Sequence, residues 1–125
     1  LYLKNTDSEV LLTFEQIARR IRKYHGAFIP ATQSIHDFIG DDDSVRSATA
    51  IFNNCQYQLV GMLKEDDLTT YLRLFYQNPL TDTQKEFLTQ AKMGEFLLTV
   101  NSKNRIRIKI EATPMEIELM KEVLL

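Results

Sequence analysis

Four basic side chains fall within five positions of this 125-residue chain, and an uncharged amide follows soon after them. The basic residues are Arg19, Arg20, Arg22 and Lys23, and the amide is Gln33 in the run Ala-Thr-Gln. Arginine suits phosphate because its planar fork can donate two parallel hydrogen bonds. A glutamine at the end of a strand can orient the water that attacks a γ-phosphate. These residue types are compatible with nucleotide sensing.

The same residues also have a structural interpretation. A basic run near the end of a helix can be a solvated face that complements the helix dipole, with Glu15 pairing to Arg19 one turn later. Gln33 can be an exposed turn residue. The sequence alone is compatible with both interpretations.

Several catalytic motifs are missing from the sequence. The four glycines, at positions 26, 40, 61 and 94, are too widely spaced to form a glycine-rich phosphate loop. No G-x-S-x-G nucleophile motif occurs, and the two histidines and one cysteine do not show metal-ligand spacing. No metal site is therefore expected, and the chain taken alone lacks a complete catalytic site.

The composition is that of an ordinary globular domain, with 44% hydrophobic and 26% charged residues. A net charge of −2 and a pI near 5.7 give no chain-wide case for nucleic-acid binding. The single cysteine fits a reducing compartment. Because the chain starts at Leu1 and ends in an apolar run, we expect residues 1–125 to be one excised segment of a longer protein.

An amphipathic helix is predicted to carry the basic cluster near its end. Its apolar stripe, at helical spacing, consists of Val10, Phe14, Ile17 and Ile21. If this stripe faces the core, Arg19 and Lys23 point away from it. Arg20 and Arg22 then lie on its flanks, where an arginine can reach a neighbouring element or subunit.

A short buried strand is predicted over residues 27–32, after Gly26 ends the helix in a left-handed conformation. Pro30 removes one backbone donor from that strand. Thr32 and Gln33 would lie at its carboxyl end, where α/β sheets bind their ligands.

The rest of the sequence alternates predicted helices and strands. Ser44, Thr81 and Thr113 have the character of helix N-caps. The predicted helices cover roughly residues 44–52, 66–77, 81–94 and 114 onward, and the predicted strands 56–63, 95–100 and 105–111. The last two strands should form an antiparallel hairpin, the final one with its basic residues facing outward. The whole pattern predicts a three-layer α/β fold with a carboxyl-terminal hairpin.

Several stretches in this order resemble the motor ATPases of type IV secretion and conjugative transfer, the VirB/TraC/TrsE-type proteins of the HerA–FtsK superfamily. The stretches are RRIRKYHG, AFIPATQ, IHDF, AIFNNCQYQLVGML and NPLTDTQKEFLTQAKMGEFLLTV. The resemblance covers roughly residues 1–112. It implies the carboxyl-terminal part of a RecA-like (P-loop NTPase) core that forms hexameric rings, with the phosphate loop and acidic metal site upstream of Leu1. The stretch LYLKN resembles the family's segment directly after the acidic pair.

By this resemblance, Gln33 matches the polar γ-phosphate sensor, and Arg22 matches an arginine that acts on the neighbouring subunit's nucleotide. Arg19, Arg20 and Lys23 are weaker matches for that arginine. Thr32 would accompany Gln33 at the nucleotide.

The resemblance also implies ATP and Mg²⁺ as cofactors of the parent protein, with none expected on the fragment, which should not hydrolyse ATP by itself. It implies a cytoplasmic protein, peripheral to the membrane, in contact with other secretion proteins at the inner membrane face.

Two other functions are compatible with the sequence. The chain could be a non-catalytic α/β interaction domain that docks a partner through its hairpin or through its last helix, whose apolar residues are Met115, Ile117, Met120 and Leu124. Nucleic-acid binding by the basic helix end is a further alternative, which the acidic pI disfavours.

Overall fold

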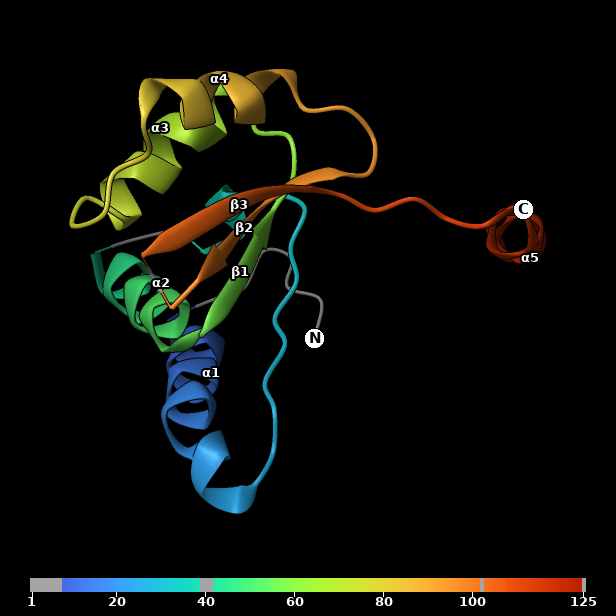
Figure 1. Cartoon of the computed structure of the whole chain (residues 1–125). Coiled ribbons are helices and arrows are strands. Elements are labelled where there is room, and N and C mark those ends of the chain that lie inside the picture. The colour runs from blue at the N-terminus through green and yellow to red at the C-terminus, as the bar shows by residue number, and fades with distance from the viewer. Residues whose placement is uncertain (1–7, 39–41, 102, 125) are drawn as a thin grey trace.

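The computed structural model describes residues 8–38, 42–101 and 103–124, and the stretch LYLKN lies outside these ranges. Figure 1 shows helices on one side of a small sheet, and a last helix that stands apart. The α-helices are α1 (Ser8–Arg20), α2 (Asp42–Asn54), α3 (Glu65–Leu74), α4 (Asp82–Gln90) and α5 (Pro114–Leu124). Two 3₁₀ turns are η1 (Ile21–Tyr24) and η2 (Ile35–Phe38). The strands are β1 (Tyr57–Val60), β2 (Glu95–Val100) and β3 (Asn104–Lys109).

The predicted first helix is confirmed, but its end differs from the prediction. After α1 the chain tightens into η1, and His25 rather than Gly26 adopts the left-handed conformation, with φ 56°. The His25 amide donates to the Arg22 carbonyl at 3.2 Å and the Gly26 amide to that of Ile21 at 3.2 Å. A Cβ at Gly26 would lie 2.8 Å from the Ile21 Cδ1 atom, so a larger residue there would require the Ile21 side chain to shift.

The predicted strand over residues 27–32 is wrong. This segment is an extended connection with a single bridge residue, Ala31, and the side chain of Ile29 is 73% exposed. Pro30 cannot donate to a ladder. In the described part of the chain the sheet has only the order β1-β2-β3, so this segment is not one of its strands.

The three strands form an antiparallel sheet, and the predicted hairpin between β2 and β3 is confirmed. In the register, Thr99 of β2 lies between Gln58 of β1 and Arg105 of β3. Because partners across a ladder point to the same face, these three side chains share one face of the sheet.

Two clusters of buried side chains form the core. The larger one joins α3, α4 and β2 and includes Tyr71, Leu74, Leu88 and Leu97. The smaller one joins α1 to α2 through Leu11, Ala48 and Ile51. Phe52 packs against both clusters, and its ring lies 5.4 Å from that of Phe75. The aromatic side chain on α2 therefore couples the two helix layers.

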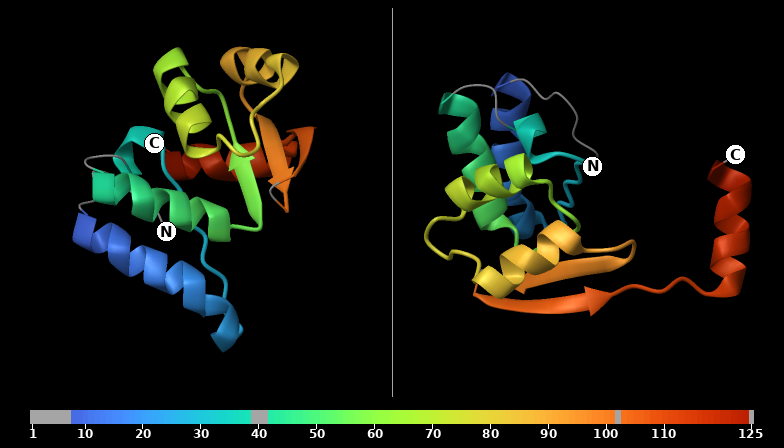
Figure 2. Two further views of the ribbon diagram at one scale, coloured as in Figure 1. Left: turned by 90° about the vertical axis from the view of Figure 1, so that its left-hand side faces the viewer. Right: turned by 90° about the horizontal axis from the view of Figure 1, so that it is seen from above.

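The two faces of the sheet differ in how far the helices cover them. Helices α2, α3 and α4 cover the face that carries Leu97, Thr99 and Arg105 (Figure 2). The opposite face carries apolar side chains that stay open, among them Tyr57 at 60%, Leu59 at 51% and Ile106 at 53% exposure. We name this surface the open sheet face; it consists of Tyr57, Leu59, Phe96, Leu98, Val100, Ile106 and Ile108.

The open sheet face corrects two expectations. The sequence over residues 56–63 predicts a buried strand, but the strand covers only Tyr57–Val60, and Tyr57 and Leu59 are exposed. The arginines of β3 are not on the open face either: both lie on the helix-covered face, where Arg105 is half-buried. Arg107 is exposed, and its guanidinium lies 5.6 Å from the centre of the Phe87 ring on α4. The alternation of apolar and basic residues along a strand predicts that the two faces of the sheet differ, but it does not specify which face the helices cover.

The helix starts predicted at Thr81 and Thr113 are confirmed. At α4, the Thr81 hydroxyl accepts from the Gln84 amide at 3.2 Å while the Gln84 side chain accepts from the Thr81 amide at 3.0 Å. At α5, Glu116 accepts from the amide and the hydroxyl of Thr113, and these hydrogen bonds lower the pKa of the Glu116 carboxyl. Ser44, predicted as a cap, lies inside α2, which starts at Asp42.

The helix predicted over 81–94 ends earlier, at Gln90. Gly94 then turns the chain with φ 84°, and its carbonyl accepts from the Ile110 amide at 2.7 Å. A Cβ at Gly94 would lie 2.6 Å from the Ile110 carbonyl oxygen, so the close approach of the two segments needs a glycine here.

Helix α5 stands apart from the body at the end of an extended segment (Figure 2). Every described side chain from residue 110 to 121 is exposed, including Met115 at 72%. Among the described residues, none of the helices has the length and apolarity needed to cross a membrane.

The two capped helices provide a test of where the stability resides. We expect Thr81→Ala to lower the free energy of unfolding by about 1 kcal/mol, because it removes a cap from a helix in the main core. Thr113→Ala is the matched control: it should reduce the helicity of α5 while leaving the urea midpoint of the body unchanged. Equal losses of midpoint would contradict the separation of α5 from the core.

Candidate functional site

Arg22 lies on η1 at the rim of an open polar cavity of about 350 Å³. The other lining residues come from the end of α2, the start of β1 and the β2–β3 turn: Asn53, Asn54, Cys55, Gln56 and Asn101. We name this the Arg22 cavity. Arg22 is exposed, and no carboxylate of the described residues lies within 4.0 Å of its guanidinium. Its charge can therefore meet an external anion.

The other basic candidates are placed differently. Arg19 pairs with Glu15, whose Oε1 atom lies 2.9 Å from the guanidinium, as the i, i+4 spacing predicted. The Glu15 side chain is only 13% exposed, so this pair ties Arg19 to its own helix. Arg20 and Lys23 are exposed.

Gln33 lies in a bend after the extended segment, and its side chain is exposed. The neighbouring Thr32 hydroxyl donates to the Ser34 carbonyl at 2.9 Å, which shapes the local turn. Ser34 in turn donates to Asp67 on α3 at 3.1 Å, and His36 lies 3.4 Å from the same carboxylate. Gln33 does not line the Arg22 cavity, so the structure does not bring the two predicted residues together in one pocket.

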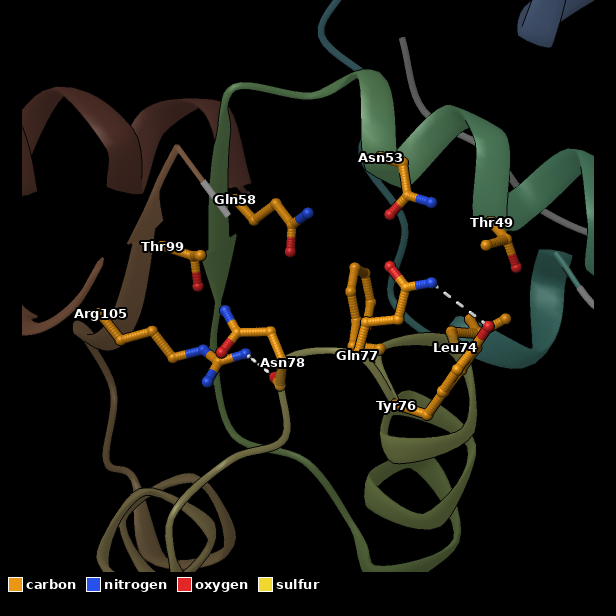
Figure 3. A pocket seen from close by; sticks show the side chains of 10 residues that line it. Thr49, Asn53, Gln58, Leu74, Tyr76, Gln77, Asn78, Thr99 and Arg105 are labelled. Carbon is orange, nitrogen blue, oxygen red and sulfur yellow. Dashed lines mark hydrogen bonds between the residues drawn. The ribbon is translucent and has the colours of Figure 1, made fainter. Parts of the chain in front are cut away.

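A second cavity, of about 180 Å³, lies between α2, β1 and the loop that joins α3 to α4 (Figure 3). Its lining residues are Thr49, Asn53, Gln58, Leu74, Phe75, Tyr76, Gln77, Asn78, Thr99 and Arg105. We name this the Arg105 cavity. No sequence pattern pointed to it, because its residues come from elements far apart in the chain and only the fold brings them together.

Arg105 holds the loop that closes this cavity. Its two terminal nitrogens donate to the backbone carbonyls of Asn78 and Pro79, the latter at 3.1 Å. These carbonyls belong to the loop between α3 and α4, so Arg105 ties this loop to β3. Among the described residues that line the cavity, Arg105 is the only charged one.

Three polar atoms near Arg105 are buried without a partner at hydrogen-bonding geometry: Arg105 Nε, Thr99 Oγ1 and the Tyr71 hydroxyl. The groups are nevertheless neighbours. Burial raises the pKa of Tyr71, while the charge of Arg105 and side-chain hydrogen bonds with Thr99 and Arg105 act to lower it. The side chains of Tyr71, Thr99 and Arg105 therefore form a small polar group inside the core and face one another.

One of three comparisons relates this chain to a known protein. A scan of protein-family models finds no match, and a search of curated proteins finds none either. A search of solved structures finds VirB4 of Thermoanaerobacter pseudethanolicus, with a TM-score of 0.76 and 31% sequence identity. The match covers 92% of this chain. The predicted resemblance to VirB4-type ATPases of type IV secretion is confirmed.

The chain spans 29% of the length of that VirB4 structure. With 31% identity over 92% of its length, this chain is similar to VirB4 in sequence as well as in fold. The match leaves most of the VirB4 structure uncovered. The activity, substrates and partners of a complete VirB4-like protein are therefore proposals for this chain.

Cys55 in the Arg22 cavity provides a test of local chemistry. Burial raises the pKa of its thiol, so the thiolate forms at higher pH than in an unfolded chain. Because the thiolate is the nucleophile, we expect slow alkylation by iodoacetamide near neutral pH and a pH–rate midpoint above that of the urea-unfolded protein. A midpoint below the unfolded value would instead indicate a thiolate stabilised by Arg22.

Proposed function

We propose that this chain is the carboxyl-terminal part of a RecA-like motor domain that hydrolyses ATP for a type IV secretion or conjugation apparatus. The observation that carries the proposal is the match to VirB4 over 92% of the chain. In the complete protein, Mg-ATP would lie at the interface between subunits of a hexameric ring in the cytoplasm, next to other secretion proteins at the membrane. The phosphate loop and the metal-binding acids would come from outside this chain.

In this proposal, Arg22 neutralises transition-state charge on the nucleotide of the adjoining subunit. Its exposure and its surroundings of neutral amides support this role, because a guanidinium without an internal carboxylate can be offered to a neighbouring subunit. Arg19 is less suited, since Glu15 already neutralises it. Arg20 and Lys23 stay weaker candidates.

Gln33 would orient the attacking water or report the γ-phosphate, with Thr32 beside it. The extended segment that leads to Gln33 supports this proposal. Residues 27–32 have the apolar composition of a buried strand, yet Ile29 is 73% exposed. A neighbouring strand from the rest of a RecA-like domain would bury this segment and fix Gln33 at its carboxyl end.

The open sheet face also supports the proposal that this chain is part of a larger domain. A contiguous apolar surface on a sheet marks a place where another layer packs. In the proposed parent protein, the remainder of the three-layer domain would cover it.

Replacing Arg22 by alanine in the complete protein tests its role. We expect ATP hydrolysis to fall by about 10³- to 10⁵-fold, as for other arginines that act in trans, while nucleotide binding is largely kept. Arg19→Ala is the matched control and should retain most of the turnover. Unchanged hydrolysis in the Arg22 variant would remove this residue from the mechanism.

A Gln33→Ala substitution separates chemistry from structure. A residue that positions water acts mainly in the transition state, so kcat should fall more than affinity for ATP. If the variant loses both equally, Gln33 has a structural role.

Docking through α5 is a second candidate function, favoured by the exposure of Met115, Ile117 and Met120 on a helix that stands apart from the body. Such an apolar helix can lie in the groove of a partner. Deletion of residues 113–125 from the complete protein distinguishes the two functions. A pure docking module would lose its partner and have no ATPase activity to measure, whereas the motor would still turn over ATP.

A further inference from the structure

The turn that carries Gln33 is closed by hydrogen bonds between the residues on either side of it. The Thr32 hydroxyl accepts from the Ser34 amide at 3.3 Å and donates to the Ser34 carbonyl at 2.9 Å. A hydroxyl that bonds to the backbone two residues further on shapes a tight turn. The backbone of Gln33 therefore lies within a defined turn, while its side chain is exposed.

Asp67 on α3 ties this turn to the body of the molecule. The Ser34 hydroxyl donates to Asp67 Oδ1 at 3.1 Å and accepts from the His36 amide at 3.2 Å. His36 Nε2 lies 3.4 Å from the same carboxylate oxygen. One carboxylate thus contacts two side chains of the segment that directly follows Gln33.

The surroundings of Asp67 favour a fixed geometry. Its side chain is only 17% exposed, which limits competition from water, and a hydrogen bond to a charged acceptor is stronger than one to a neutral acceptor. Between Ser34 and His36, Ile35 is buried and packs into the larger apolar cluster with Tyr71 and other residues. Polar and apolar contacts therefore attach the same short segment to α3.

We propose that Asp67 is a positioning residue for Gln33. It holds the turn through Ser34, so that the Gln33 amide is presented to the attacking water in one orientation, and it makes no contact with the nucleotide itself. This inference rests on the proposed function, in which Gln33 orients that water. In the complete protein, residues 27–32 would fix Gln33 from its amino side and Asp67 would fix it from its carboxyl side.

The kinetics of ATP hydrolysis by the complete protein test this role. Asp67→Ala removes the acceptor of the Ser34 hydroxyl, and a misplacement of about 1 Å at a catalytic group can cost about 10²-fold in rate. We expect kcat to fall by about 10- to 100-fold, while KM for ATP changes by less than about threefold because binding of the nucleotide is not altered. Asp67→Asn keeps an oxygen acceptor at this position and should retain most of the turnover. Asp66→Ala is the matched control, because it removes an exposed acid from the same first turn of α3, and it should leave kcat unchanged.

A double-mutant cycle with Gln33 separates positioning from a general structural effect. If Asp67 acts through Gln33, Asp67→Ala should cause no further loss of kcat in a protein that already carries Gln33→Ala. A structural effect elsewhere would multiply with that of Gln33→Ala instead. Ser34→Ala provides a second route to the same result, because it removes the donor of the hydrogen bond and leaves α3 intact. Its loss of kcat should match that of Asp67→Ala.

The inference and the proposed function fail in different ways. Normal turnover in Asp67→Ala and Ser34→Ala, together with slow turnover in Gln33→Ala, would overturn the inference alone. Losses that multiply in the double variant would also overturn it. Normal turnover in Gln33→Ala would instead overturn the proposed role of Gln33, and with it a positioning role for Asp67.

Discussion

The register of the β2–β3 hairpin determines which side chains meet the helices. Thr99 pairs with Arg105 and Leu97 with Arg107, so two arginines and two inward residues share the covered face of the sheet. A slip of one residue would turn the isoleucines of β3 toward the helices and the arginines toward solvent. The Arg105 cavity and the open sheet face are both consequences of this register.

The end of α2 connects the two polar regions of the molecule. Asn53 lines both the Arg22 cavity and the Arg105 cavity. Just before it, Ile51 and Phe52 anchor the helix in the core, with Phe52 in contact with both apolar clusters. This packing places the side chains at the carboxyl end of α2 next to β1 and η1. Figure 3 shows how the amides from these separate elements converge on one space.

Local signals in the sequence predicted most elements correctly. The capping residues Thr81 and Thr113 marked two helix starts, and alternation with a short link marked the β2–β3 hairpin. The main failure was the strand at 27–32. Its apolar run is typical of a buried strand, but a strand requires a neighbour along its length, and within the described residues this segment is not part of the three-stranded sheet. The left-handed turn also differs from the prediction: His25, and not Gly26, has the positive φ.

The sequence by itself determined the helices, the hairpin and the resemblance to VirB4-type ATPases, because these depend on short-range periodicity, caps and ordered motifs. It also singled out Arg22 and Gln33 by residue type, although their roles remain proposals. Only the tertiary structure decided which face of the sheet is covered, that Arg105 is drawn inward to the carbonyls after α3, and that Thr99 is buried beside Tyr71 and Arg105. The physical reason is that burial and polar satisfaction depend on contacts between distant segments, and no local pattern specifies which side chains those contacts will enclose.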